Sequence, residues 1–160
     1  MKKLLILFTF LSLSFSGFCQ DYSTLITYAF ETEEDYKKAE LKIMECANYL
    51  LINPMDLDPR NRYSAVQFIV KWMGGTPDYN FSMEPEAMEI TKNRPDLFSM
   101  YMACITKAAI KNNEKSLSQA ELHTKAVNYL IDYCSVDDNN LSTSKGLRKI
   151  IKQREKESDQ

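Results

Sequence analysis

The sequence predicts an all-α fold: a bundle of about five main helices, packed as antiparallel hairpins, with one extended aromatic loop. Apolar residues recur at steps of three and four along most of the chain, which is the spacing of one helix face. The helical stretches are separated by short segments rich in Pro, Gly, Asn and Asp. Helices joined by such short connections pack as neighbours in a bundle.

Length and composition set the class of protein. The chain has 160 residues, of which 44% are apolar and 26% are charged, the balance of a globular domain rather than of a disordered chain. Its 4 glycines and 1 histidine leave little material for a glycine-rich nucleotide loop or a histidine metal site. We therefore predict a single helical domain over residues 20–151, with no cofactor and no metal ion.

Residues 1–19 have the pattern of a secretory signal peptide. Two lysines precede an uncharged apolar run over residues 4–15, which is too short to span a bilayer. Gly17 and Cys19 are the small residues that a signal peptidase requires before its cleavage site. We expect a mature chain that begins at Gln20 and is exported, to the periplasm or out of the cell.

Two further expectations concern the membrane and nucleic acids. A lipoprotein signal at Cys19 would need a small preceding residue, and Phe18 is bulky, so we do not expect lipidation. No later uncharged run exceeds 10 residues, so we expect no membrane span in the mature chain. Basic residues are scattered among more numerous acids, a pattern that does not predict nucleic-acid binding.

The first helix is predicted over residues 32–51. Thr32 and Asp35 resemble a capping box at its start, and Asn53 and Pro54 end it because proline lacks the amide hydrogen. Its apolar stripe consists of Tyr36, Ala39, Ile43, Cys46, Ala47 and Leu50.

The second helix is predicted to begin at Asp58 and Pro59. It ends at Gly74 and Gly75, since glycine tolerates the left-handed conformation that closes many helices. Its buried face is expected to consist of Tyr63, Val66, Ile69, Val70 and Met73.

The middle of the chain alternates loop and helix. Helical spacing breaks down over residues 76–85, which predicts the extended aromatic loop. A short helix is expected over residues 86–93 and a longer one over residues 95–112. Ser118 with Glu121 forms a capping box for the next helix.

That helix is predicted to end at Cys134, followed by a turn over residues 137–140. Thr143 or Ser144 then caps a last helix, whose apolar residues stop at Ile151. The segment 152–160 is charged, has no apolar anchor and is expected to fray. A positive cluster in this region is interpreted as a complement to the helix dipole; it consists of Lys145, Arg148, Lys149, Lys152 and Arg154.

Cysteines and acids give no catalytic or metal motif. Cys46, Cys104 and Cys134 have spacings that match neither a zinc knuckle nor a CxxC pair, so we expect buried thiols or one bridge among them. His123 has no nucleophile motif beside it and is interpreted as an exposed helical histidine. The acids over residues 33–35 are interpreted as partners of a helix dipole. We therefore predict no enzymatic activity.

The best candidate for a binding site is the stretch FIVKWMGGTPDYNF over residues 68–81. Aromatic side chains beside a flexible turn can form a recognition surface. Alternatively, the loop folds back over the bundle and its tryptophan belongs to the core. The candidate binding residues are Trp72, Thr76, Asp78, Tyr79 and Phe81.

The run KWMGGTPDYNF resembles a family of short exported bacterial proteins of unknown function. The likeness continues through LFSMYMACITK at residues 97–107 and AVNYLIDYC at residues 126–134, and covers roughly residues 46–151. Members of that family have a signal peptide, a K-W-M-x-G-T-P-D-Y-x-F stretch and a helical remainder. The resemblance implies an exported helical protein and brings no activity, cofactor or catalytic residue.

These observations lead to one expected function and two alternatives. We expect a non-catalytic module of the cell envelope that binds another protein through residues 72–81. The 8 methionines suggest, as an alternative, a carrier that encloses a small apolar ligand between its helices. A hydrolase based on two carboxylates is the third possibility, since the 22 acidic residues do not exclude one.

Overall fold

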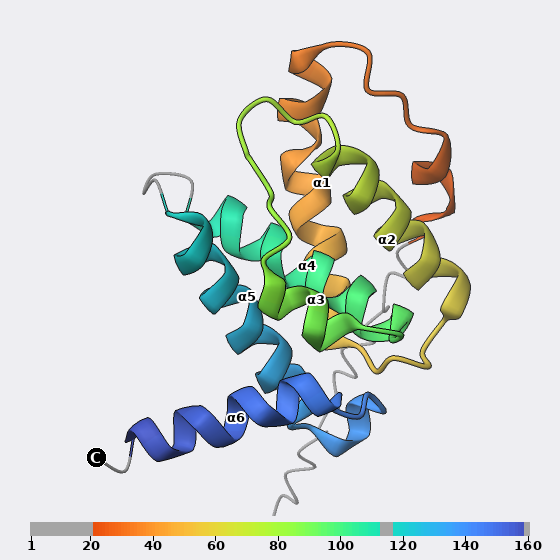
Figure 1. The fold of residues 1–160 in the computed structure, drawn as a ribbon. Helices are drawn as coiled ribbons and strands as arrows, with labels where there is room; N and C mark the ends of the chain where they lie inside the picture. The colour runs from red at the N-terminus through yellow and green to blue at the C-terminus, as the bar shows by residue number, and fades with distance from the viewer. Residues whose placement is uncertain (1–20, 113–116, 159–160) are drawn as a thin grey trace, which may run out of the picture.

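The computed structural model describes residues 21–112 and 117–158, which form an all-helical fold without strands (Figure 1). This confirms the predicted fold class. The signal peptide predicted for residues 1–19 lies outside the described residues, as do Gln20 and residues 159–160. The helices are α1 Glu33–Ile52, α2 Pro59–Met73, α3 Pro85–Thr91, α4 Pro95–Lys111, α5 Gln119–Cys134 and α6 Lys145–Ser158, with 3-10 turns η1 Ser23–Thr27 and η2 Asp137–Asn139.

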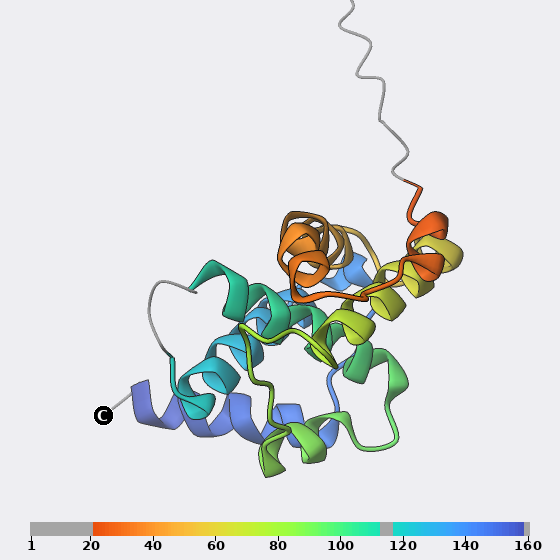
Figure 2. The ribbon, with the colours of Figure 1, turned by 90° about the horizontal axis from the view of Figure 1, so that it is seen from above.

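Helix α4 occupies the middle of the bundle. It contacts α1, α2, α3 and α5, and ten of its 17 residues are buried. In Figure 2, α1 and α2 lie on one side of α4, while α5, α3 and α6 lie on the other. A helix covered on several sides must be apolar around most of its circumference, which explains the LFSMYMACIT sequence of α4. None of the helices described is long and apolar enough to cross a membrane.

The starts of α1 and α5 follow the predicted capping boxes. The Thr32 amide donates to the Asp35 carboxylate at 2.8 Å, and the Ser118 amide donates to the Glu121 carboxylate at 2.9 Å. Each box satisfies backbone groups that a helix start leaves unpaired. These two starts are fixed by residues three positions apart, which is why the sequence alone locates them.

The buried face of α2 differs from the predicted one. Tyr63 is 61% exposed and Val70 is 40% exposed, whereas Phe68 and Trp72 are buried. The prediction followed apolar residues alone, but α2 packs against η1, α1 and α4 through a face that also contains polar side chains. The buried residues are Asn61, Arg62, Ser64, Ala65, Phe68, Ile69 and Trp72.

Arg62 explains why this face of α2 is turned inward. Its Nη1 donates to the carbonyl oxygens of Leu50, Asn53 and Pro54 at 3.2 to 3.3 Å. These carbonyls belong to the end of α1 and the residues that follow it, where a helix leaves acceptors unpaired and its dipole favours a cation. The guanidinium therefore joins α2 to the end of α1.

The double glycine after α2 has another role than the one predicted. Gly74 is right-handed, with φ −73°, and neither glycine has a positive φ, so the predicted left-handed helix end is wrong. Gly75 is needed for space instead: a Cβ there would lie 2.1 Å from Oη of Tyr36. The Tyr36 ring lies directly against the backbone at this point, so only glycine leaves room for it.

The loop over residues 74–84 folds back over the bundle. Trp72 is fully buried, and its indole Nε1 donates to the Tyr36 carbonyl at 3.0 Å. The rings of Tyr79 and Phe81 lie 5.3 and 6.0 Å from the Trp72 ring. The tryptophan therefore belongs to the core, and the loop packs against its ring through Tyr79 and Phe81.

Helix α6 extends beyond its predicted end at Ile151 and includes residues up to Ser158. Ser144 caps its start, where its hydroxyl accepts from the Leu147 amide at 3.0 Å. Arg154 hydrogen-bonds Asn128 of α5, and Gln153 donates to Glu157 at 3.2 Å. Residues 152–158 are therefore helical and make polar contacts. The sequence predicts fraying there because the segment has no apolar anchor.

Candidate functional site

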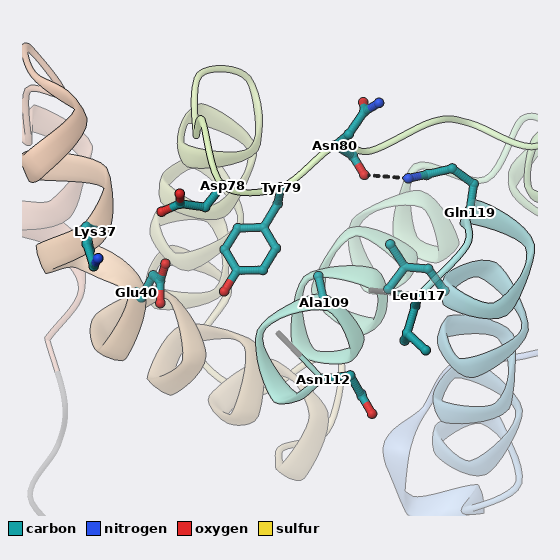
Figure 3. A pocket seen from close by; sticks show the side chains of 10 residues that line it. Lys37, Glu40, Asp78, Tyr79, Asn80, Ala109, Asn112, Leu117 and Gln119 are labelled. Atoms are coloured by element: carbon teal, nitrogen blue, oxygen red, sulfur yellow. Dashed lines mark hydrogen bonds between the residues drawn. The ribbon is translucent and has the colours of Figure 1, made fainter. Parts of the chain in front are cut away.

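A polar cleft of about 540 Å³ lies between α1, the loop over residues 74–84, the end of α4 and the start of α5 (Figure 3). Its volume falls in the range of ligand-binding pockets, roughly 300 to 1,000 Å³. Hydrogen-bonding groups dominate the lining, and four separate segments contribute them. The polar lining residues are Lys37, Glu40, Asp78, Tyr79, Asn80, Asn112 and Gln119.

Gln119 holds the loop wall of the cleft in place. Its side-chain Nε2 donates to the Asn80 carbonyl at 2.9 Å, as Figure 3 shows. Its Oε1 accepts from the amide and the hydroxyl of Ser82 at 3.1 and 3.0 Å. One side chain from the first turn of α5 thus fixes two loop residues, so the wall is formed before any ligand binds.

The charge of the cleft is concentrated at Glu40 and Asp78. Partial burial and the neighbouring Asp78 carboxylate raise the pKa of Glu40, while Lys37 and a hydrogen bond from Tyr79 act in the opposite direction. Figure 3 shows the Asp78 and Glu40 side chains on the same side of the cleft. Two carboxylates and one ammonium leave the cleft with an excess of one negative charge. Burial is the main cause of the raised Glu40 pKa, and the Asp78 carboxylate adds to it.

The five candidate binding residues separate into two groups. Asp78 and Tyr79 line the cleft, and Asp78 is exposed while Tyr79 is half-buried. Trp72 and Thr76 are buried, and Phe81 is half-buried against the Trp72 ring. The second group therefore positions the loop, and only the first group meets the solvent of the cleft.

The remaining polar residues of the cleft were missed at the sequence level. Lys37 and Glu40 lie one turn apart near the start of α1, which we interpreted only as a capped helix. Gln119 follows a capping serine and resembled an ordinary first-turn residue. Their contact with the loop depends on packing between segments distant in sequence, for which no local signal exists.

His123 is buried, so its interpretation as an exposed histidine is wrong. It is 6% exposed and lies on the inner face of α5, next to Leu122. Its Nδ1 lies 2.9 Å from the Tyr101 hydroxyl, and its Nε2 lies 2.7 Å from the Glu86 carboxylate. The short helix α3 carries Glu86 to the ring, and no local pattern indicates a contact between residues 37 positions apart.

This Tyr101–His123–Glu86 chain connects three helices. With Nε2 protonated, His123 donates to Glu86 and accepts from Tyr101, so both ring nitrogens are paired. Burial raises the pKa of Tyr101, whose side chain is fully enclosed, so its phenol stays protonated and bound to the histidine. The arrangement suits a clamp between α3, α4 and α5 better than an accessible nucleophile.

A second, smaller cavity bears on the carrier alternative. It measures about 230 Å³ and its apolar lining includes Met73, Phe81, Met83 and Met102. That volume is below the roughly 300 Å³ at which ligand pockets begin. Three of the eight methionines therefore line a space smaller than a typical ligand pocket.

The three cysteines among the described residues are free thiols that are wholly or partly buried. Cys46 and Cys104 are buried and Cys134 is half-buried. Burial raises the pKa of Cys46 to about 12 and that of Cys134 to about 11, which keeps both thiols protonated and unreactive near neutral pH. Within residues 21–112 and 117–158, no group of three or more His, Cys, Asp or Glu side chains is placed to hold a metal ion.

Comparison of the chain with protein-family models, with curated proteins and with solved structures finds no match.

Proposed function

We propose that the protein is a non-catalytic binding module of the cell envelope, which recognises another protein through the polar cleft. The observation that supports this proposal is the preformed cleft of about 540 Å³, walled by Asp78, Tyr79 and the loop that Gln119 holds. A preformed wall lowers the entropy lost on binding. The proposed export to the envelope still rests on the sequence pattern of residues 1–19.

The chemistry of the cleft favours a basic side chain of the partner. A lysine or arginine head group placed between Glu40 and Asp78 would pair with both carboxylates and offset the repulsion by which Asp78, after burial, raises the Glu40 pKa. The side-chain oxygen of Asn112 supplies a further acceptor, while its Nδ2 donates to the Ala108 carbonyl. Charge-assisted hydrogen bonds of this kind are about twice as strong as neutral ones.

Affinity capture tests the proposal. The purified mature chain is compared with a cleft variant, Glu40→Gln with Asp78→Asn, as bait in an envelope extract from its own host. A control variant, Asp137→Asn with Asp138→Asn, makes the same change in charge at η2. We expect a partner that the wild type and the control retain and the cleft variant loses. Equal retention by all three would contradict the proposal.

One observation favours a second candidate, the carboxylate-based hydrolase. Glu40 has a raised pKa and shares the cleft with a second carboxylate, and such a pair can divide the roles of general acid and base. Hydrolysis of nitrophenyl glycosides by the wild type, lost in Glu40→Gln, would support this candidate. No turnover across a panel of sugars would leave binding as the function of the cleft.

A further inference from the structure

Helix α6 carries a row of exposed cations on the side that faces away from the bundle. Leu147 and Ile150 face inward and are 0% and 8% exposed. Apart from two adjacent residues, the outward residues are three or four positions from one another, which places all of them on one face of the helix. These exposed residues, here called the basic row, are Lys145, Arg148, Lys149, Lys152 and Lys156.

The basic row is held on a fixed support. A Cβ on Gly146 would lie 2.8 Å from the Glu89 carbonyl oxygen, so the start of α6 lies directly against the backbone of α3. Arg154, on the inner side of α6, hydrogen-bonds Asn128 of α5. In Figure 1, α6 lies along the lower edge of the molecule, with α3 and α5 above it.

Charge is strongly segregated between α6 and the rest of the chain. Helix α6 contains six basic and two acidic residues, whereas residues 21–144 contain 12 basic and 19 acidic residues. The ion pairs found between described residues include none from the basic row. The row is therefore a positive surface on an otherwise acidic protein, with its charges available to an outside partner.

We propose that the basic row docks the protein on a surface of anionic phospholipid headgroups. A straight row of lysines suits a flat array of negative charges, and each basic residue close to such a surface adds to the attraction. The apolar side of α6 is already buried against the bundle, so the helix adsorbs by charge without inserting. Binding of this kind is reversible and is screened by salt.

The composition of the row argues for headgroups over nucleic acid. Helix α6 has no aromatic side chain on which a base could stack. Gln153, which could read a base edge, is hydrogen-bonded to Glu157. Docking through α6 would also leave the start of α1 and the first part of the loop over residues 74–84 away from the membrane, since both lie toward the upper edge in Figure 1.

Vesicle co-sedimentation of the full mature chain tests this inference. The vesicles contain phosphatidylcholine with or without phosphatidylglycerol. We expect binding at low ionic strength only where phosphatidylglycerol is present, with release as salt is added. The variant Lys149→Gln, Lys152→Gln, Lys156→Gln should bind at least roughly tenfold more weakly.

The matched control is Lys38→Gln, Lys42→Gln, Lys92→Gln, which removes the same charge from exposed positions elsewhere. It should bind within about twofold of the wild type, and circular dichroism should show all three proteins equally helical. Equal loss in both variants, or equal binding to pure phosphatidylcholine, would overturn the proposal. Tighter binding to a DNA duplex than to the anionic vesicles at the same ionic strength would overturn it as well.

Discussion

The hydroxyl of Tyr101 lies 2.9 Å from Nδ1 of His123. His123 is the middle member of a hydrogen-bonded chain that runs from Tyr101 to Glu86. Because α4, α5 and α3 each contribute one member, this chain fixes the short helix α3 on the bundle. Helix α3 in turn supports the start of α6 through the close approach at Gly146. The position of α6 thus depends on a buried polar contact elsewhere in the fold.

Tyr101→Phe should lower the free energy of unfolding by about 1 to 3 kcal/mol, because it leaves a buried ring nitrogen of His123 without its donor. Urea unfolding followed by circular dichroism measures this change. Tyr63→Phe is the matched control, since Tyr63 is 61% exposed. It should change the stability by less than about 0.5 kcal/mol. Equal effects of the two substitutions would show that the buried contact contributes little.

Gly75→Ala should destabilise the protein, whereas Gly74→Ala should not. A Cβ at Gly75 meets the Tyr36 hydroxyl and ring, whereas a Cβ at Gly74 has its nearest neighbour at 3.6 Å. We expect Gly75→Ala to destabilise the protein by about 1 to 3 kcal/mol. Gly74→Ala should be neutral or stabilise by up to about 1 kcal/mol, because alanine restricts the unfolded chain.

Tyr36→Phe supplies a second check on that pair. It removes the atom closest to the added Cβ, so it should recover part of the stability lost in Gly75→Ala. Thermal unfolding of the two single variants and the double variant gives the coupling between the sites. If the stability changes of the two single variants add exactly in the double variant, the alanine at position 75 does not meet the Tyr36 hydroxyl.

Stability should fall steeply at alkaline pH. Burial raises the pKa of Cys46 from its usual 9.0 to about 12, and also raises the pKa values of Tyr22 and Tyr101. Between pH 9 and pH 12 the unfolded chain loses the Cys46 proton while the folded chain retains it. The stabilisation is complete below pH 9 and is lost as pH rises through the folded pKa.

Urea midpoints measured across this pH range check the alkaline prediction. Cys46→Ala should be less stable at neutral pH because of the small cavity it leaves, but its stability should decline less steeply with pH. A slope identical to that of the wild type would show that the Cys46 thiol is not protected by burial.

The Glu40 carboxyl should titrate at lower pH once its neighbour is neutral. Asp78→Asn removes a nearby charge that raises the Glu40 pKa, so we expect that pKa to fall. Carbon-detected NMR titration of the side-chain carboxyl reports it directly. Asp137→Asn, on η2 away from the cleft, should leave the Glu40 pKa unchanged. An equal fall of the Glu40 pKa in this control would show that Asp78 acts on Glu40 no more strongly than a distant carboxylate does.

Local signals predicted most of the fold. Thr32 and Ser118 cap their helices through residues three positions away, and prolines mark the starts of α2 and α4, so short-range chemistry decides these boundaries. The buried face of α2 could not be predicted in this way. Arg62 is charged and would ordinarily be placed in solvent, but the carbonyl oxygens at the end of α1 pair with its guanidinium inside the fold.

The residues of the candidate site also divide into those that local patterns indicate and those that depend on long-range packing. Asp78 and Tyr79 were identified because aromatic residues beside a glycine and proline turn form an unusual local pattern. Glu40 and Gln119 were not identified, since each occupies an ordinary helical position whose meaning comes from the loop opposite. No local sequence pattern identifies residues such as these, because they come together only through the packing of distant segments.

Binding of a single amino-acid side chain tests the central proposal most directly. Nα-acetyl-lysine methylamide is titrated into the ¹⁵N-labelled mature chain and followed by amide chemical shifts, with the norleucine derivative as the uncharged control. The lysine derivative should shift the amides of Lys37, Glu40 and residues 78–80 and should leave α6 unaffected, and Glu40→Gln with Asp78→Asn should abolish these shifts. Shifts of equal size with norleucine, or none in the cleft with lysine, would contradict the proposal that this cleft receives a basic side chain.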